Sequence, residues 1–261
     1  MPFSPRSIPW ILFLFVLPAV AQHLRVELVE ELAIGDDEDA PVDYLFAGPV
    51  HVQVDSQGRL YVADMHRASV SVFDREGVFV TSIGSRGQGP GEIREITTMT
   101  VDHHDALIVL DRMNARFTRY ANLGKTFEMY PVPEAIMVSS HQMQPLGEDA
   151  FALYYRVYGE AETRRTEVMH LYDAGFKAVQ ASLMPMADLW DLDSPFERAI
   201  AGSPSKLYFA TDGEDRMLVA PYFYNGVIHR YERRPGGWQR QEWIGKRPSN
   251  APYKLLDYEA V

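Results

Sequence analysis

Asp55-Ser-Gln-Gly-Arg-Leu-Tyr-Val-Ala-Asp64 returns 47 residues later as Asp102-His-His-Asp-Ala-Leu-Ile-Val-Leu-Asp111. The same spacing separates Gly77 from Gly124. Each copy alternates short apolar runs with residues that favour turns. A repeat of about 40–50 residues that holds several short strands is typical of the blades of a β-propeller. The repeat therefore predicts an all-β fold, a propeller of four-stranded antiparallel blades.

Within the first copy, turn residues separate four predicted strands. Asp55 can cap the backbone that follows it, and Gly58 accepts a positive φ, so the two together favour a tight turn. Alternating or mostly apolar runs on either side of such turns are typical of strands. The predicted strands are residues 50–54, 60–63, 70–73 and 78–83, and the second copy repeats the pattern over residues 97–130.

Two weaker copies follow. Residues 212–220 align with residues 55–63 at a spacing of 157 and precede apolar runs at 227–231 and 239–244. Residues 142–183 are expected to form the blade between them, with strands at 151–155 and 168–172. Residues 187–192 are expected to hold a short helical turn.

The copies do not by themselves complete a ring. An additional strand is expected at residues 25–34, where it could fill the last blade and so protect a sheet edge. The tail at residues 248–261 is typical of the approach to a fifth blade. We expect the chain to be truncated at Val261, and a closed ring of four or five blades is the alternative.

These copies resemble NHL-type repeats of six-bladed β-propellers. Leu60-Tyr-Val-Ala-Asp64 is similar to the strand-and-turn core of such repeats, and Asp111-Arg-Met-Asn-Ala-Arg-Phe117 to their Asp-x-x-Asn-x-Arg-hydrophobic segment. Gly84-Ser-Arg-Gly-Gln-Gly-Pro-Gly-Glu92 resembles the loop between blades in exported bacterial members. The resemblance implies the fold but no single activity, since propellers of this type include lyases, lactonases and binding scaffolds.

The N-terminus is typical of a secretory signal peptide. Arg6 precedes an apolar stretch at residues 8–20, and Ala19-Val20-Ala21 matches the small-x-small cleavage pattern. We therefore expect a signal peptide at residues 1–21 and a propeller domain at residues 22–261. Because the stretch is shorter than the about 20 residues of a membrane span, we expect no integral membrane association after cleavage. The predicted location is periplasmic or secreted.

The composition narrows the classes of partner. The formal net charge is −11, so the basic surface that nucleic-acid binding needs is not expected. The chain has no cysteine, which excludes disulfides and a lipid-attachment cysteine. A domain of this length can bury enough apolar surface to be stable without disulfides.

Basic side chains concentrate in the segments expected at the top face of the propeller, residues 64–69, 84–96 and 111–116. Guanidinium groups bind carboxylate, phosphate or sulfate, so these segments predict a recess for a small anionic molecule, a glycan or a peptide. The alternative is that Arg112 and Arg116 are structural clips between turns. The candidate ligand-binding residues are His66, Arg67, Arg86, Glu92, Arg94, Arg112, Asn114 and Arg116.

A catalytic interpretation has weaker support. The glycine-rich loop lacks the Lys-Ser/Thr ending of a P-loop, and its simpler role is an irregular crossing between blades. His51, His66, His103, His104, His141 and His229 could supply metal ligands, but no set of them matches a known motif. We predict no cofactor and a binding or interaction module. The alternative is a metal-dependent lyase or lactone hydrolase that uses a divalent ion.

Overall fold

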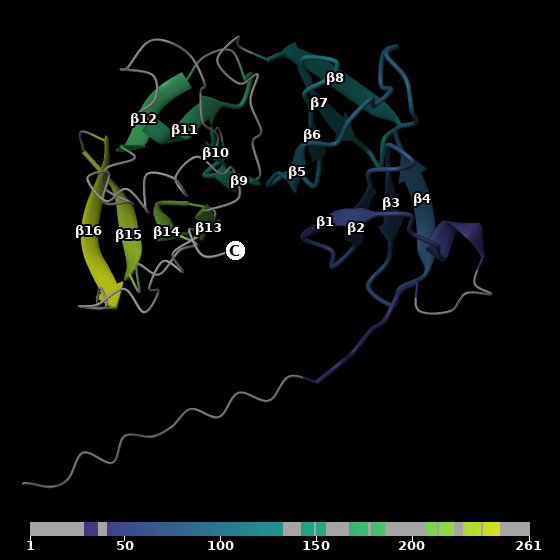
Figure 1. Ribbon diagram of the computed structural model, residues 1–261, viewed down its shortest axis with the longest axis horizontal. Helices are drawn as coiled ribbons and strands as arrows, with labels where there is room; N and C mark the ends of the chain where they lie inside the picture. Colours follow the sequence, from purple (N-terminus) through teal and green to yellow (C-terminus); the bar gives the residue numbers. More distant parts are fainter. Residues whose placement is uncertain are drawn as a thin grey trace, which may run out of the picture. The chain divides into compact units, whose positions relative to one another are not determined.

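Four four-stranded antiparallel sheets make up most of the described chain (Figure 1). The structure is a computed structural model that describes residues 29–35, 41–132, 142–148, 150–154, 167–176, 179–185, 207–212, 214–221, 227–235 and 237–245. The chain divides into two units, Met1–Glu31 and Leu32–Val261, and all four sheets belong to the second. The predicted signal peptide, the helical turn at 187–192 and the tail at 248–261 lie outside the described residues.

Each sheet is formed by four consecutive strands, and we call the sheets blades 1 to 4. Blade 1 contains β1 (Pro49–Val54), β2 (Leu60–Asp64), β3 (Ser69–Phe73) and β4 (Phe79–Ile83). Blade 2 contains β5 (Thr98–Val101), β6 (Leu107–Asp111), β7 (Arg116–Ala121) and β8 (Thr126–Pro131). Blade 3 contains β9 (Gln142–Leu146), β10 (Ala150–Tyr154), β11 (Glu167–Asp173) and β12 (Val179–Pro185). Blade 4 contains β13 (Leu207–Thr211), β14 (Arg216–Pro221), β15 (Val227–Arg234) and β16 (Gly237–Gly245).

The turn aspartates explain why these strands begin and end where they do. Asp55 Oδ1 accepts the backbone N–H groups of Gln57 and Arg59, both at 2.9 Å, and so closes the β1–β2 turn. Asp102 and Asp212 make the same pair of contacts in blades 2 and 4. Capping of the turn, the role expected for Asp55, is therefore confirmed, and Asp102 and Asp212 have the same role in their blades.

The apolar core lies between neighbouring blades. Side chains on alternate positions of a strand point to opposite faces, so each inner blade packs on two neighbours at once. Leu107 and Val109 of β6 pack in a cluster with blade 1, whereas Ile108 and Leu110 pack in a cluster with blade 3. A third cluster joins blades 3 and 4. Since both of its faces are covered, β6 is buried along its whole length.

The first strands of successive blades are in contact, β1 with β5, β5 with β9 and β9 with β13. Side chains of one first strand hydrogen-bond the backbone of the next. His51 Nε2 lies 3.2 Å from the Thr97 carbonyl oxygen. In the same way Gln142 contacts the backbone of Phe209, and Gln144 Oε1 accepts the N–H of Thr211. These contacts hold the four blades in sequence order.

Two features differ from the sequence-based expectation. Residues 29–34, the described part of the additional strand expected at 25–34, form no strand. Blade 4 already has four strands of its own, so its outer position is filled by β16. A short 3-10 helix, Val42–Tyr44, precedes β1 and was not predicted. No helix among the described residues is long and apolar enough to cross a membrane.

Candidate functional site

The candidate site lies at the end of the strands where the β4–β5 loop meets two turns. Pro49, at the start of β1, pairs with Asp64 at the end of β2, so the chain enters a blade beside its β2–β3 turn. The loop at residues 84–97 enters blade 2 beside the β6–β7 turn in the same way. The structure therefore brings together the segments 64–69, 84–96 and 111–116, as the sequence predicted.

The β4–β5 loop closes on itself. The Gly87 N–H donates to the Ile93 carbonyl at 3.0 Å, and the Ile93 N–H donates to the Ser85 carbonyl at 2.7 Å. The carboxylate of Glu92 turns into the loop, where its Oε2 accepts the Gly89 N–H at 2.7 Å. The Gly89 N–H, which could have donated to a bound anion, thus donates to a carboxylate of the chain itself. This contact supports the interpretation of the glycine-rich loop as a crossing between blades.

Asp111 anchors this loop to blade 2. Its Oδ2 accepts the backbone N–H of Arg94 at 2.7 Å, and its Oδ1 accepts that of Glu95 at 3.2 Å. Asp64 does the same one repeat earlier, where its Oδ2 accepts the Ala47 N–H at 2.9 Å. Both aspartates are 1% exposed, so their hydrogen bonds are shielded from water.

The Asp64 carboxyl is held in its ionised form. Burial alone would raise its pKa, but the N–H groups of Ala47, Arg67 and His66 and the Arg67 guanidinium outweigh burial and lower the pKa below the ordinary value. The Arg67 Nε lies 3.6 Å from Asp64 Oδ2. The negative charge of Asp64 is therefore stabilised by neighbouring N–H groups and by Arg67 of the same turn.

Two of the predicted site residues are structural clips. Arg116 Nη2 donates to the carbonyls of Gly89 and Glu92 at 2.6 and 2.7 Å. Asn114 Nδ2 donates to the Gly87 carbonyl at 3.0 Å and to Asp111 Oδ2 at 2.7 Å. The clip role that sequence analysis left open for Arg116 is the one its guanidinium performs in the structure.

Three further arginines contact carbonyl or carboxylate oxygens near them. Arg86 Nη2 donates to the His66 carbonyl at 2.6 Å, and Arg67 Nη1 donates to the Val42 carbonyl at 2.9 Å. Arg112 Nη2 lies 3.0 Å from Glu95 Oε1. The contact of Arg86 is with a carbonyl dipole, so its positive charge is not neutralised there. The backbone of His66 contributes to this contact, and its side chain is exposed.

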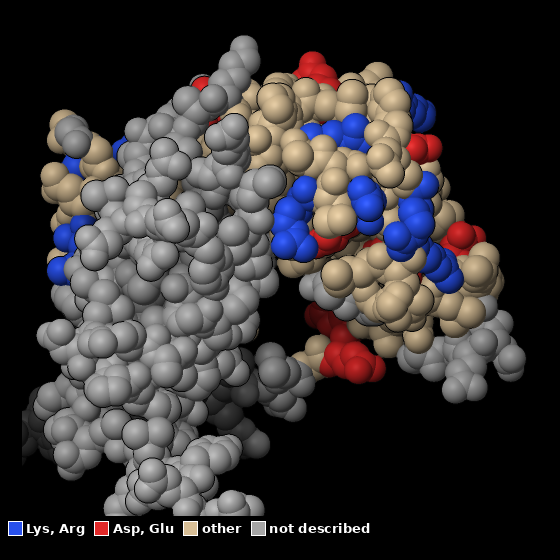
Figure 2. All heavy atoms as spheres, turned by 45° about the horizontal axis from the view of Figure 1, so that its top comes forward, with Lys and Arg blue, Asp and Glu red and all other residues tan. Residues whose placement is uncertain are grey.

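Arg94 differs from these arginines because its side chain makes no hydrogen bond or ion pair with the described residues. Its backbone is nevertheless fixed by Asp111, as described above, and its side chain is exposed. Figure 2 shows Lys and Arg side chains gathered on the surface over β1–β8, to the right of the view. A fixed backbone with an unpaired guanidinium makes Arg94 the strongest candidate for contact with an anionic ligand.

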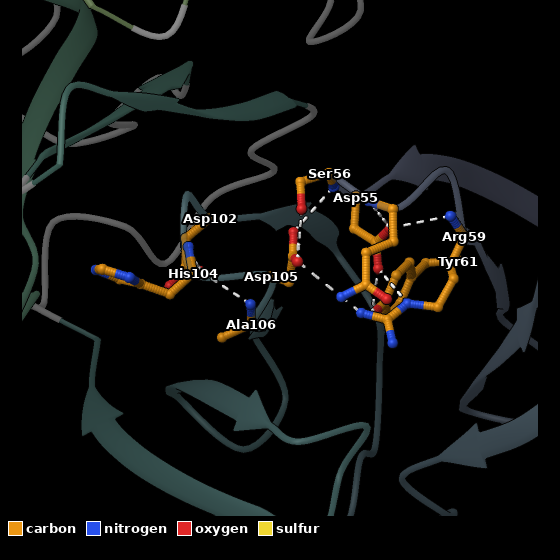
Figure 3. A network of polar contacts seen from close by, with 9 residues as sticks. Asp55, Ser56, Arg59, Tyr61, Asp102, His104, Asp105 and Ala106 are labelled. Carbon is orange, nitrogen blue, oxygen red and sulfur yellow. Dashed lines mark hydrogen bonds and ion pairs between the residues drawn. The ribbon is translucent and has the colours of Figure 1, made fainter.

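A second polar network lies at the opposite end of the strands (Figure 3). Asp105 of blade 2 accepts the Ser56 N–H at 2.9 Å and the Ser56 hydroxyl at 2.8 Å, so it joins the β1–β2 turn to the β5–β6 turn. Asp55 Oδ2 lies 2.5 Å from Arg59 Nε and also accepts the Tyr61 hydroxyl. Burial raises the pKa of Tyr61 to about 12, so this hydroxyl keeps its proton.

Beside this network is an open polar pocket of about 350 Å³, to which Arg59, His104, Asp105 and Lys125 contribute. Sequence analysis did not identify this pocket. The only sequence signal was the position of Asp105, which lies 47 residues after Gly58 and so takes the place of that turn glycine in the second repeat. Like that glycine, it has a positive φ, 58° against 79°.

The described histidines that were considered as metal ligands do not come together in one cluster. The described residues contain no group of three or more His, Cys, Asp or Glu side chains that could hold a metal ion. His51 contacts the Thr97 carbonyl, His103 and His104 are exposed in a turn, and His229 is buried in blade 4. His141 lies outside the described residues.

Repeated four-stranded blades with an apolar core between them define a β-propeller. The chain matches a family described as 6-bladed beta-propeller (DUF5128) over residues 43–174, half of its length, and it belongs to that family. The predicted six-bladed propeller class is therefore confirmed. The narrower NHL-type assignment stays a prediction.

One solved structure supports the fold, and a second is reported for comparison. A Bacteroides fragilis protein classed as exported is 16% identical with a TM-score of 0.57, over 77% of this chain and 52% of that chain. A streptogramin B lyase is 12% identical with a TM-score of 0.45, over 77% of this chain and 56% of that chain. The chain thus spans about half the length of these proteins. No protein with a curated description matches it.

Proposed function

We propose that the protein is an exported binding module, and that the end of the strands carrying the β4–β5 loop holds a small anionic or peptide-like ligand. The observation that carries the proposal is Arg94, whose backbone is anchored by the buried Asp111 while its guanidinium has no partner among the described residues. Such a group is positioned without being neutralised. Guanidinium groups bind carboxylate and phosphate oxygens through two parallel hydrogen bonds.

Arg86 is the second expected contact. It lies in the same loop, is exposed, and hydrogen-bonds only carbonyl oxygens, so its positive charge remains available. Arg67 and Arg112 each share their charge with a carboxylate and are expected to contribute less. Arg116, Asn114 and Glu92 hold the loop in place and are not expected to contact the ligand directly.

Export supports this function. Residues 1–21 predict a signal peptide and with it a periplasmic or secreted location, and this prediction is supported by the Bacteroides fragilis structure, which is of a protein classed as exported. A binding module there would encounter metabolites, glycans and peptides that carry carboxylate or phosphate groups. The overall charge of −11 would disfavour anions in general, so binding must depend on the local arginines.

Isothermal titration tests the proposal with three probes, inorganic phosphate, citrate and an acidic tetraglutamate peptide. We expect at least one probe to bind, and Arg94→Ala combined with Arg86→Ala to raise its Kd by about tenfold or more. Arg75→Ala is the matched control, because Arg75 is an exposed arginine of blade 1 in the β3–β4 turn. Absence of binding by all three probes, or an equal effect of the control, would show that this surface does not bind anions.

A further inference from the structure

The polar pocket beside the network of Figure 3 is formed by three turns from two neighbouring blades. The β1–β2 turn of blade 1 contributes Arg59, and the β5–β6 turn of blade 2 contributes Asp105. The β7–β8 turn of blade 2 contributes Asn122 and Lys125. The volume of about 350 Å³ is at the lower end of the range for pockets that hold small molecules. The pocket therefore has room for a ligand about the size of one sugar unit.

The backbone around this pocket is held in a conformation that most residues avoid. Asn122 and Leu123 have φ angles of 51° and 56°, and Asp105 has a φ of 58°. Asparagine and aspartate tolerate this left-handed region, whereas a leucine there is strained. Six non-glycine residues of the described chain have a positive φ, and three of them border this pocket. Strained residues of this kind concentrate at sites that bind ligands.

Packing on blade 1 holds the β7–β8 turn in place. The Leu123 side chain packs against the core cluster that blades 1 and 2 share. A Cβ at Gly124 would lie 3.1 Å from Ile83 Cγ1, so the turn backbone lies directly on blade 1. One repeat earlier, the matching turn is closed by the Asp74 carboxylate, but Ala121 takes the place of Asp74 here. The turn is thus positioned by its contacts with the next blade rather than by a side-chain cap.

One cation of the pocket is not neutralised. The Arg59 Nε is paired with Asp55, and its Nη2 lies 4.0 Å from Asp105 Oδ2. The Lys125 side chain is exposed, and its ammonium group makes no hydrogen bond or ion pair with the described residues. A lysine on a positioned turn with no carboxylate beside it favours an anionic group of a ligand.

The other polar groups of the pocket suit hydroxyl groups. The side-chain amides of Gln57 and Asn122 have no hydrogen-bond partner among the described residues, and each amide can both donate and accept. The two carboxylate oxygens of Asp105 each accept one hydrogen bond from Ser56. Each oxygen can accept one more. A ligand that matches the whole pocket therefore carries an anionic group together with several hydroxyl groups.

We propose that this pocket binds a small hydroxylated carboxylate of the sugar-acid class. Lys125 binds the carboxylate of the ligand, and Asn122, Gln57 and Asp105 bind its hydroxyl groups. The pocket shares no residue with the β4–β5 loop site and lies at the opposite end of the strands. The proposal is therefore independent of the function proposed above.

Isothermal titration with three probes tests both halves of this recognition. Glucuronate carries the carboxylate and the hydroxyls, glucose lacks the carboxylate, and acetate lacks the hydroxyls. Glucuronate is expected to bind with a Kd in the millimolar range or below, and the other two at least about tenfold more weakly. No binding of glucuronate, or equal binding of glucose or acetate, would overturn the proposal.

Lys125→Ala is expected to raise the Kd for glucuronate by about tenfold. Arg75→Ala is the matched control, because Arg75 is an exposed cation in the corresponding turn of blade 1, and it should leave this Kd unchanged. Asn122→Gly removes the amide while glycine accepts the positive φ, and it should raise the Kd by about threefold. All three side chains are exposed, so the variants are expected to fold, which circular dichroism checks.

The variant with Arg94→Ala and Arg86→Ala separates the pocket from the loop site. It is expected to bind glucuronate as the wild type does, whereas Lys125→Ala is expected to leave the binding of phosphate, citrate or tetraglutamate unchanged. Glucuronate binding that is lost in the double arginine variant and kept in Lys125→Ala would assign the ligand to the loop site. That result would overturn the pocket proposal and leave the loop site standing.

Discussion

Asp111 accepts the backbone N–H of Arg94, and Asp64 accepts that of Ala47, so the same hydrogen bond recurs one repeat apart. Each donor precedes its aspartate by 17 residues, and each aspartate is the last residue of the second strand of its blade. The 47-residue period therefore extends beyond the strands to the loop that leads into each blade. It fixes the position of the arginine on which the proposed function depends.

Removal of this anchor should be costly. Asp111→Ala leaves the N–H groups of Arg94, Glu95 and Asn114 without their acceptor at a buried site, and the expected loss is about 2–3 kcal/mol of unfolding free energy. Urea denaturation measures it. Asp74→Ala is the control, because Asp74 also accepts two backbone N–H groups but in an exposed turn, and a loss of about 1 kcal/mol or less is expected. Equal losses for the two variants would contradict the anchoring role.

Alanine substitutions at Gly84 and Gly58 distinguish the cost of a left-handed backbone conformation from the cost of a steric clash. Gly84 has a φ of 77°, and a Cβ there would lie 2.4 Å from Ile93 Cδ1; Gly58 has a φ of 79°, with its nearest neighbour at 3.4 Å. Gly58→Ala is expected to cost about 1 kcal/mol for the left-handed conformation alone. Gly84→Ala should cost about 1–2 kcal/mol more, because Ile93 belongs to the core between blades 1 and 2. Thermal unfolding compares them, and a larger loss at Gly58 would refute the steric argument.

Removal of the Arg116 side chain should reduce stability far more than removal of the Arg94 side chain. Arg116→Ala leaves the carbonyls of Gly89 and Glu92 without their donor, so a loss of about 1–3 kcal/mol of unfolding free energy is expected. Arg94→Ala should change stability by less than about 0.5 kcal/mol, because the guanidinium makes no hydrogen bond or ion pair with described residues. The pair of urea curves would contradict the assignment if Arg94→Ala were the more destabilising variant.

The turn aspartate of blade 4 should make stability depend on pH. Burial alone would raise the pKa of Asp212, but hydrogen bonds from Arg216 and the Glu214 N–H lower it to about 2. Because the folded-state pKa lies below the unfolded one, the stabilisation is complete above about pH 4 and is lost as the pH falls towards about 2. The difference in unfolding free energy between wild type and Asp212→Asn should therefore shrink across this range. A difference that stays constant with pH would contradict the prediction.

The strands of blades 1 and 2 and the last three strands of blade 4 could be predicted because their signals are local. An alternating run, an aspartate at its end and a glycine three residues on are enough to mark a strand and its turn, as at Asp55 and Gly58. The grouping of the arginine-bearing segments followed from the propeller fold that the repeat predicts, in which these loops lie at the same face. These parts of the fold need no information about which residues meet in space.

The roles of individual side chains could not be predicted in the same way. Arg116 contacts carbonyls 24 and 27 residues earlier, and Gln142 contacts Phe209, 67 residues later. Nothing in either neighbourhood marks these partners. Sequence analysis named Arg116 as a clip or a ligand contact and could not choose, because the choice depends on where the loop carbonyls point.

The contacts of the β4–β5 loop make this loop part of the same structural unit as blade 2, although it lies outside the sheet of that blade. Asp111, Asn114 and Arg116 all belong to the β6–β7 region, yet each holds residues between 87 and 95. The amide protons of Arg94 and Glu95 should therefore exchange with solvent as slowly as those of β6, although they lie outside any strand. A segment excised to study blade 2 by itself would have to begin at Gly84 rather than at Thr98.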